Sequence, residues 1–314
     1  MIHVKGLTKL YGNKVGVEDV SFDVGRGAVA GLLGPNGAGK STIMKLLTGY
    51  SAPQAGEITV DGVDVIHDYR TAAVKTGYAP EIPPLFPEMT VEGYLFFVAD
   101  LKNIKKGDRS AHITMIMEMT RITDVRKRLL KNLSKGYRQR VGIAQALVGF
   151  PPVLILDEPT AGLDPTQIAQ LRELLHSLGG KHTIILSSHI LSEITNLCEE
   201  VIIINNGRVT VQKSLKNASE KDSVFLLTLN TSDRDRAISC VRGVKGIIDA
   251  MSDNTDDRFF SIRIRFDPEQ DEAIETRSAL FLALSAAKLP ILELVRKRES
   301  LEELYLEATV GRVS

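Results

Sequence analysis

Gly34-Pro35-Asn36-Gly37-Ala38-Gly39-Lys40-Ser41-Thr42 has the glycine spacing and the Lys-Ser pair of a phosphate-binding loop. The apolar run 28–33 before it predicts a buried strand, and residues 42–48 after it predict a helix. Glycines allow the loop's backbone amides to turn toward an anion, and the helix start adds its positive dipole end. Lys40 is expected to reach the β- and γ-phosphates, and the Ser41 hydroxyl to bind Mg²⁺. The stretch therefore predicts a site for a nucleoside triphosphate.

Length and composition limit the classes of protein that fit. The chain has 314 residues, enough for one large domain and a smaller one. Lys+Arg and Asp+Glu each number 39, so the net charge is zero and we expect no nucleic-acid partner. The N-terminal residues lack the apolar run of a signal peptide, and no apolar run approaches membrane-spanning length. We therefore expect a cytoplasmic protein that reaches a membrane only through a partner.

The order of predicted elements indicates an α/β fold with a helical insert. Residues 2–33 and 58–65 predict a β-rich layer around the phosphate-binding loop. Residues from about 82 to 150 predict helices only. Strands and helices alternate again over 153–211, which argues for a sheet with parallel strands at its centre. We expect one nucleotide-binding domain over residues 1–218.

The remaining residues, 219–314, predict a separate small α+β domain. Its elements follow the order βαββαβ, which fits a ferredoxin-like fold, with a hairpin turn at 253–257. A final helix is expected after Ser300. No ligand motif is recognisable in this domain.

A second chemical motif is the apolar run 153–156 followed by Asp157 and Glu158. Asp157 is expected to hold Mg²⁺, often through water, and Glu158 to polarise the attacking water. An acidic pair at a strand end can also simply face solvent. The phosphate-binding loop upstream favours the chemical interpretation.

Five segments together resemble the ATP-binding-cassette (ABC) transporter ATPases. They are the phosphate-binding loop, Leu133-Ser134-Lys135-Gly136, Asp157-Glu158, Ala161-Gly162-Leu163-Asp164 and His189, in the order and spacing of that family. The resemblance covers residues 1 to about 215. It implies a P-loop NTPase core with a RecA-like sheet, an antiparallel β layer and a helical subdomain. It also implies an ATPase that uses ATP and Mg²⁺, pairs with a second ATPase subunit as a homodimer, and drives a separate integral-membrane permease from the cytoplasmic face.

The resemblance also implies roles for single residues outside the phosphate-binding loop. Tyr11 is similar to the aromatic residue that stacks on adenine, although without that match a tyrosine in the core is an equal interpretation. Ser134 and Gly136 would contact the γ-phosphate bound to the opposite subunit. Asp164 would lie in the loop that links the two sites of the dimer. His189 would contact the γ-phosphate and orient the attacking water.

Two segments depart from the family pattern, at three positions in all. The family usually has Leu-Ser-Gly-Gly-Gln, whereas Lys135 and Tyr137 replace the first Gly and the Gln. Lys135 would add positive charge near phosphate or simply be solvated. Glu81 stands where the family has a Gln that binds Mg²⁺; an ionised carboxylate can still bind the metal or its water but repels phosphate. The Tyr-x-Pro-Glu form ending at Glu81, with the segment 300–306, resembles the subgroup that drives type-2 ABC permeases, mostly exporters.

A group of apolar residues lies where the family docks its permease. The group consists of Leu85, Phe86, Tyr94, Phe96 and Phe97. These residues predict either a groove that grips a cytoplasmic helix of a permease or the core of the helical insert.

Two other functional classes compete with a transport motor. A soluble ABC ATPase that remodels ribosomes or DNA usually has two cassettes or a long coiled-coil insertion, and this sequence contains neither. A nucleotide-gated regulator would sense a ligand through its C-terminal domain.

Overall fold

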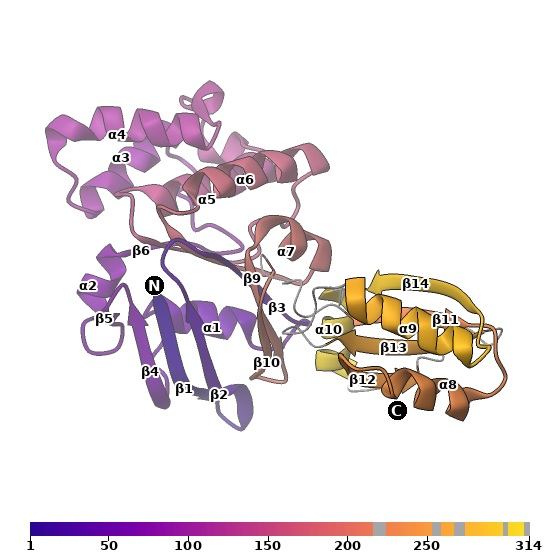
Figure 1. The fold of residues 1–314 in the computed structure, drawn as a ribbon. Coiled ribbons are helices and arrows are strands. Elements are labelled where there is room, and N and C mark those ends of the chain that lie inside the picture. The colour runs from indigo at the N-terminus through magenta and orange to yellow at the C-terminus, as the bar shows by residue number, and fades with distance from the viewer. Residues whose placement is uncertain (216–223, 253–258, 267–273, 298–300, 311–314) are drawn as a thin grey trace. The chain divides into compact units, whose positions relative to one another are not determined.

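The computed structural model describes residues 1–215, 224–252, 259–266, 274–297 and 301–310, so the predicted turn at 253–257 and Ser300 lie outside the described residues. Two compact units result: Met1–Leu215 with Tyr305–Ser314, and Lys216–Leu304 (Figure 1).

The last helix, α10 (Leu301–Val310), corrects the predicted domain limits. The sequence placed all of 219–314 in the C-terminal domain, whereas the residues from Tyr305 onward group with the first unit. The side-chain amide of Asn205 donates to the carbonyl oxygens of Ala308 and Thr309, at 3.1 and 3.2 Å. Such long-range hydrogen bonds leave no trace in the sequence pattern.

A six-stranded sheet forms the centre of the first unit, in the order β10-β9-β3-β8-β7-β6. Its strands are Val29–Leu33 (β3), Thr76–Ala79 (β6), Val153–Leu156 (β7), Thr183–Ser188 (β8), Glu200–Asn205 (β9) and Arg208–Ser214 (β10). The strands are parallel from β9 to β6, and β10 pairs antiparallel with β9. The predicted parallel centre is confirmed. The loops that follow β3, β6, β7 and β8 therefore emerge at the same edge of the sheet.

A four-stranded antiparallel sheet, ordered β2-β1-β4-β5, forms a second layer. Its strands are Ile2–Tyr11 (β1), Lys14–Val24 (β2), Ala55–Val60 (β4) and Val63–Asp64 (β5). Helix α1 (Lys40–Leu47) shares one buried core with both sheets, to which Ile2 of β1, Ile43 of α1 and Ile155 of β7 contribute. This apolar cluster fixes the start of α1 against the edge of the parallel sheet.

Helical segments fill the chain between β6 and β7 and cover the sheet after it. The first group is α3 (Val91–Leu101), α4 (Lys106–Met119), the 3₁₀ turns Thr123–Val125 and Leu130–Asn132, and α5 (Lys135–Leu147). The others in this unit are α2 (Tyr69–Val74), α6 (Pro165–Leu178) and α7 (Leu191–Leu197). The predicted N-cap of α3 is confirmed, because the Thr90 hydroxyl accepts the Gly93 amide at 3.1 Å.

The second unit has its own sheet and its own apolar core. Its elements are β11 (Val224–Leu229), α8 (Arg234–Arg242), β12 (Ile247–Ser252), β13 (Phe260–Phe266), α9 (Ile274–Ala286) and β14 (Ile291–Lys297). The sheet is antiparallel in the order β12-β13-β11-β14. With β11 as the first of its four strands, this is the 2-3-1-4 order of the split βαβ arrangement, so the predicted ferredoxin-like topology is confirmed.

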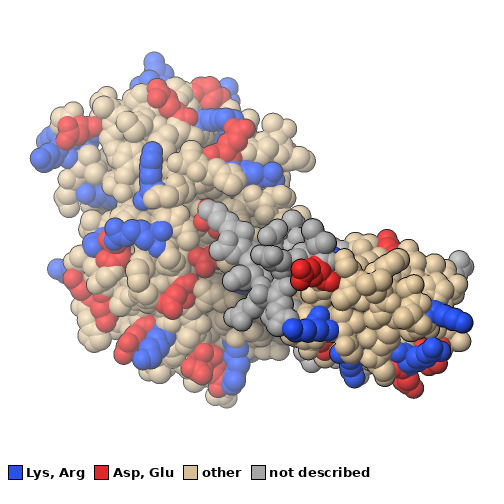
Figure 2. Space-filling view, in the orientation of Figure 1, with Lys and Arg blue, Asp and Glu red and all other residues tan. Residues whose placement is uncertain are grey.

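The described residues contain no helix of the length and apolarity needed to cross a bilayer. Charges of both signs are interspersed over the face shown in Figure 2, in keeping with the zero net charge of the sequence.

Candidate nucleotide-binding site

The phosphate-binding loop joins β3 to α1 and leaves the start of that helix open. Gly37 and Gly39 have φ values of 81° and 110°, which side chains with a Cβ rarely adopt. A Cβ on Gly34 would lie 2.4 Å from the carbonyl oxygen of Ile204, so the loop can pass β9 only as glycine. Helix α1 has no side-chain N-cap. Its first amides therefore remain available to an anion.

Lys40 is the cation of this loop and is nearly buried, with 7% of its surface exposed. Its ammonium donates to the carbonyl oxygens of Gly34 and Pro35, at 2.7 and 3.3 Å. Burial lowers the pKa of Lys40, while the carboxylates of Glu158 and Asp157 act in the opposite direction. The ammonium is thus held by loop carbonyls that a phosphate group can replace.

Asp157 and Glu158 follow β7 and are held by a serine from the neighbouring strand. The Ser187 hydroxyl donates to Asp157 Oδ1 at 2.6 Å and accepts the backbone amide of Glu158 at 2.8 Å. Glu158 has a φ of 47°, an unusual conformation for a residue with a side chain. These bonds fix the orientation of the two carboxylates at the sheet edge.

Glu158 lies between two groups that can act on a phosphate. Its Oε2 is 2.9 Å from His189 Nδ1, and its Oε1 is 3.9 Å from Lys40 Nζ. His189 follows β8, and a second buried carboxylate ties this loop to the one after β7. That carboxylate, Glu193, accepts hydroxyl bonds from Thr160 and Ser188, each at 2.6 Å. The loops after β7 and β8 are therefore joined by hydrogen bonds, and they bring Glu158 and His189 together.

These groups surround a cavity of about 360 Å³. Predicted residues that line it are Asn36, Gly37, Gly39, Lys40, Ser41, Thr42, Glu81, Glu158 and His189. Gly34, Pro35, Ala38 and Asp157 support the cavity without lining it. Two further residues line it: Gly16, which no motif indicated, and Ala161, which lies in a family segment but was given no role. The bracing residues Ser187 and Glu193 were not predicted either, because no local motif indicates them.

Tyr11 lies at the rim of this cavity. A Cβ on Gly16 would lie 2.8 Å from the Tyr11 ring, so the ring covers a glycine that lines the cavity. Tyr11 is 48% exposed and the Lys9 ammonium lies 5.5 Å from its ring centroid. The interpretation of Tyr11 as a core residue is therefore wrong, and its position suits contact with a planar base.

The oxygen donors of the cavity suit Mg²⁺ only together with phosphate and water. Ser41 and Glu81 line the cavity, and Asp157 lies behind it with one carboxylate oxygen bonded to Ser187. Within the described ranges, no three His, Cys, Asp or Glu side chains form a metal-binding group. Mg²⁺ commonly takes one or two protein ligands and completes its octahedron with phosphate oxygens and water.

Ser134, Gly136 and Asp164 lie outside this cavity. Ser134 caps α5 through a long 3.4 Å contact with the Tyr137 amide. Asp164 caps α6 and accepts the Gln167 amide at 2.8 Å. A Cβ on Gly136 would lie 2.5 Å from the Gln167 side chain, so α5 and α6 begin in contact. The starts of α5 and α6 therefore form one surface, in which each helix is capped by a side chain of this chain.

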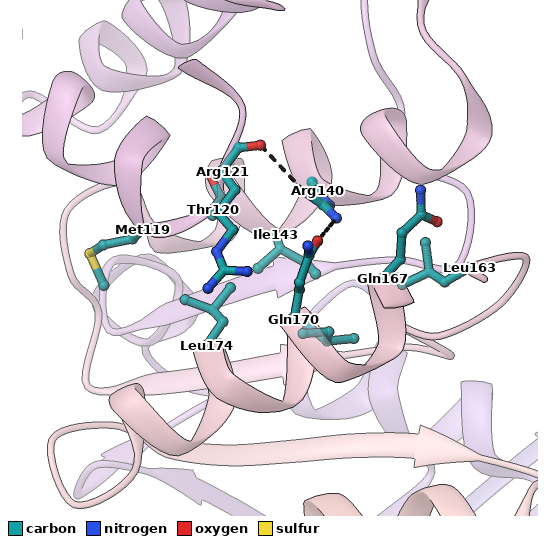
Figure 3. A pocket seen from close by; sticks show the side chains of 10 residues that line it. Met119, Thr120, Arg121, Arg140, Ile143, Leu163, Gln167, Gln170 and Leu174 are labelled. Carbon is teal, nitrogen blue, oxygen red and sulfur yellow. Dashed lines mark hydrogen bonds between the residues drawn. The ribbon is translucent and has the colours of Figure 1, made fainter. Parts of the chain in front are cut away.

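The contact between α5 and α6 continues along both helices, as Figure 3 shows. Arg140 donates to the side-chain oxygen of Gln170 on α6 and, at 3.3 Å, to the carbonyl of Arg121 after α4 (Figure 3). The space left among these residues is about 20 Å³, room for about one water molecule. The helical insert is therefore hydrogen-bonded to α6, which starts at the loop containing Asp164.

Comparisons with known proteins agree with this arrangement. The family model described as "ABC transporter" matches residues 17–161. The bacitracin transport ATP-binding protein BcrA of Bacillus licheniformis is 34% identical over 76% of this chain and 77% of its own length. The lantibiotic transport ATP-binding protein SrtF of Streptococcus pyogenes is 34% identical over 72% of this chain and 96% of its own. The Nod factor export ATP-binding protein I of Rhizobium meliloti is 38% identical over 66% of this chain and 62% of its own.

Solved structures give the same result. An ATP-binding subunit of an ABC transporter superimposes with a TM-score of 0.64 and 33% identity, over 69% of this chain and 91% of its own. A dimeric bacterial ABC transporter cassette superimposes with a TM-score of 0.64 and 25% identity, over 68% of this chain and 99% of its own.

Proposed function

This chain belongs to the ATP-binding proteins of ABC transporters and is an ATP-hydrolysing subunit of such a transporter, and we propose that two copies enclose two ATP molecules to drive export through a separate membrane permease. The observation that carries the proposal is the Glu158 carboxylate, 2.9 Å from His189 and 3.9 Å from Lys40 at the edge of the cavity.

The chemistry follows from the placement of these groups. The loop amides at the start of α1 and the Lys40 ammonium hold the β- and γ-phosphates. Glu158 accepts hydrogen bonding from the attacking water and increases its nucleophilicity, while His189 fixes the direction of the Glu158 carboxylate. Ser41, Asp157 and Glu81 would hold Mg²⁺, which neutralises the charge that develops on the phosphate oxygens.

The dimer is proposed because each chain contains two halves that do not meet. Ser134 and Gly136 lie outside their own chain's cavity, and α5 begins with an exposed serine. A second copy, related by two-fold symmetry, would place these residues on the γ-phosphate held by the first. The dimeric cassette among the similar structures supports this arrangement.

A test of the catalytic assignment is Glu158→Gln. This change keeps the shape and removes the charge, so we expect ATP binding within about twofold of wild type and hydrolysis reduced by about 10²-fold or more. Phosphate release and equilibrium ATP binding measure the two quantities. Normal turnover in Glu158→Gln would remove Glu158 from the role of catalytic carboxylate.

The permease is proposed to dock in a groove beside the helical insert. A cavity of about 520 Å³ is lined by Tyr50, Tyr78, Ile82, Val98 and Lys102, among others. Its surroundings expose apolar side chains: Tyr50 at 79%, Ile82 at 82%, Phe86 at 50%, Phe97 at 38% and Leu101 at 65%. Such a concentration of exposed apolar surface suits an amphipathic helix.

The apolar group predicted for this region divides in the structure. Tyr94 is buried, and its hydroxyl donates to Gln145, so it belongs to the core. Phe86 and Phe97 are exposed and their rings touch edge to face, 5.5 Å between centroids. The core interpretation therefore holds for Tyr94, and the docking interpretation is supported for Phe86 and Phe97.

Co-purification from detergent-solubilised membranes tests the docking surface. We expect Phe86→Ser to lose its co-purifying membrane protein while ATP binding stays unchanged. Ile248→Ser, a similarly exposed apolar residue of the second unit, is the matched control and should retain the partner. Retention by Phe86→Ser, or loss of its fold, would count against docking at this groove.

The relatives reported above are named for bacitracin transport, lantibiotic transport and Nod factor export. They support export by a complex on the cytoplasmic face of a membrane. They favour a transport motor over a soluble nucleotide-gated regulator.

A further inference from the structure

The hairpin between β9 and β10 ends in a tight turn beside the phosphate-binding loop. β9 ends at Asn205 and β10 begins at Arg208, so Asn206 and Gly207 form a two-residue turn with φ values of 48° and 78°. Positive φ at both turn residues is the type I′ geometry, which favours an Asn-Gly pair. The sequence and the geometry therefore give the end of this hairpin a defined backbone shape.

Gly207 of this turn joins two segments of the nucleotide site. Its amide donates to the carbonyl oxygen of Ala38 in the phosphate-binding loop at 3.0 Å, and its own carbonyl accepts the Glu18 amide of β2 at 2.8 Å. A Cβ on Gly207 would lie 3.2 Å from the Cα of Val17, so the turn packs closely on β2. The same strand contains Gly16, which lines the nucleotide cavity. Gly207 therefore fixes the phosphate-binding loop relative to β2.

The strand before the turn contacts the phosphate-binding loop at a second point. The carbonyl oxygen of Ile204, the residue before Asn205, lies 2.4 Å from the position that a Cβ on Gly34 would take. Gly34 begins the loop, and Ala38 lies four positions later. Because the hairpin contacts both, a displacement of the hairpin would displace the loop.

The side chain of Asn205 connects this hairpin to the end of α10. Its amide nitrogen donates to the carbonyl oxygens of Ala308 and Thr309, at 3.1 and 3.2 Å. Because both partners are acceptors, the NH₂ side of the amide must face them. These carbonyls belong to the last turn of a helix that ends at Val310, where intrahelical amide donors run out. Asn205 therefore caps the C-terminal end of α10 from a distant part of the chain.

This contact lies where the chain returns to the first unit. The first segment of that unit ends at Leu215, and the second begins at Tyr305 within α10. Asn205 is two positions from Gly207, so the residue that caps α10 is two positions from the amide that holds the phosphate-binding loop. The hairpin is thus held by α10 through Asn205 and holds the loop through Gly207.

We propose that Asn205 is a positioning residue for ATP binding: by holding the end of α10 on the β9–β10 hairpin, it keeps the phosphate-binding loop in the arrangement that receives the β- and γ-phosphates. The inference rests on the proposed function, in which this loop holds the phosphates of ATP. The coupling is reciprocal, because a contact that increases ATP affinity is itself strengthened when ATP binds. Nucleotide occupancy and the last turn of α10 therefore affect each other.

Asn205→Leu tests the proposal, because leucine has a similar size and no hydrogen-bond donor. With the hairpin less firmly held, the loop is in its binding arrangement for a smaller fraction of the time, so ATP affinity should fall by about fivefold. Hydrolysis at saturating ATP should stay within about twofold, because Glu158 and His189 are unchanged. Calorimetry at low temperature measures the Kd, and phosphate release measures kcat and KM. A lower free energy of unfolding with an unchanged Kd would overturn the proposal, because a purely structural cap predicts that result.

Ala308→Pro disturbs the same contact from the side of the helix. Proline removes an amide and clashes with the preceding turn, so the two acceptor carbonyls should move away from Asn205. ATP binding should weaken by about the same factor as in Asn205→Leu. In the double variant the second change should add less than about 1.5-fold, because both changes remove one contact. Full multiplication of the two effects would contradict the proposal.

Asn206→Gly is the matched control, because Asn206 is exposed in the same turn and glycine keeps its positive φ. It should leave the Kd for ATP within about 1.5-fold of wild type. A loss equal to that of Asn205→Leu would show that any change in the turn weakens binding, and would overturn the specific role of Asn205.

Hydrogen exchange in the unaltered chain tests the coupling without a substitution. Mg²⁺-ATP should slow the exchange of the backbone amides of residues 305–310 by about fivefold where exchange follows detachment of this turn, as reciprocity requires. Unchanged exchange at saturating ATP would overturn the coupling and leave the ATPase function standing. Failure of the unaltered chain to bind ATP would instead contradict the proposed function.

Discussion

Two helix N-termini would contact phosphate in the proposed dimer. These are the start of α1, at the phosphate-binding loop, and the start of α5, at Ser134, and they are built differently. The start of α1 has no side-chain cap, contains a nearly buried lysine and faces a cavity that the Glu158 carboxylate also lines. The start of α5 has an exposed serine, a 3.4 Å cap and no phosphate-binding loop opposite it among the described residues. One half of the site is assembled within the chain, and in the proposed dimer a second chain completes the other.

The largest loss of ATP hydrolysis is expected from a substitution in the phosphate-binding loop. Lys40→Met removes the cation that would hold the β- and γ-phosphates, so hydrolysis should fall by about 10²-fold or more. ATP binding to the isolated chain should weaken as well, because this half acts without a partner. Equilibrium binding and phosphate release check both. Undiminished binding would show that the phosphate-binding loop does not hold the nucleotide.

A substitution at the start of α5 should affect dimerisation rather than ATP binding by the isolated chain. Ser134→Glu adds a negative charge, which a helix start tolerates, but this charge would face the γ-phosphate of the second chain. We expect ATP binding to the isolated chain to stay within about twofold, because the two halves are separate. ATP-dependent dimerisation should be lost and hydrolysis should fall by about tenfold or more. Sedimentation with and without ATP measures the first; a dimer that forms normally contradicts the account.

The contribution of Ser187 to the site around α1 can be measured as a change in the free energy of unfolding. Ser187→Ala removes the hydroxyl bonded to Asp157, which is 5% exposed, and to the Glu158 amide. The free energy of unfolding should fall by about 1–3 kcal/mol, because a nearly buried carboxylate loses a partner. Denaturant unfolding gives the value. Unchanged stability would mean that this hydroxyl does not brace the site.

The smallest effects are expected on the free energy of unfolding when the N-cap residues of α3 and α5 are replaced. They distinguish a cap that stabilises its helix from a cap that would contact phosphate. Thr90→Ala, at the start of α3, should cost about 1 kcal/mol, because its hydroxyl bonds the Gly93 amide at 3.1 Å. Ser134→Ala should cost less than about 0.5 kcal/mol, because its cap contact is 3.4 Å long. Equal costs in denaturant unfolding would show that Ser134 serves mainly to stabilise its helix.

Motifs predicted the parts of this molecule that local sequence determines. Glycine spacing identified the phosphate-binding loop, an apolar run before Asp157 identified β7, and hydrophobic alternation identified the ferredoxin-like order of the second unit. Each signal arises within one element and its turns. The fold could therefore be outlined before the neighbours of any strand were known.

The remaining features depend on contacts between distant segments. Ser187 meets Asp157 because β8 lies beside β7, and Gly16 reaches the cavity because the second sheet packs on α1. Residues from Tyr305 onward join the first unit partly through Asn205. Periodicity and propensity do not encode which strands become neighbours, so these residues gave no signal in the sequence.

Complementation between two impaired chains tests most directly the claim that each site is shared. Lys40→Met and Ser134→Glu chains, each with strongly reduced hydrolysis alone, are mixed in equal amounts with ATP. A mixed dimer would pair the intact phosphate-binding loop of one chain with the intact Ser134 of the other. Random pairing then predicts hydrolysis of about a quarter of the wild-type rate, if the two sites act independently, together with recovered ATP-dependent dimers. A mixture that hydrolyses ATP no faster than its components and forms no ATP-dependent dimer would contradict the shared site.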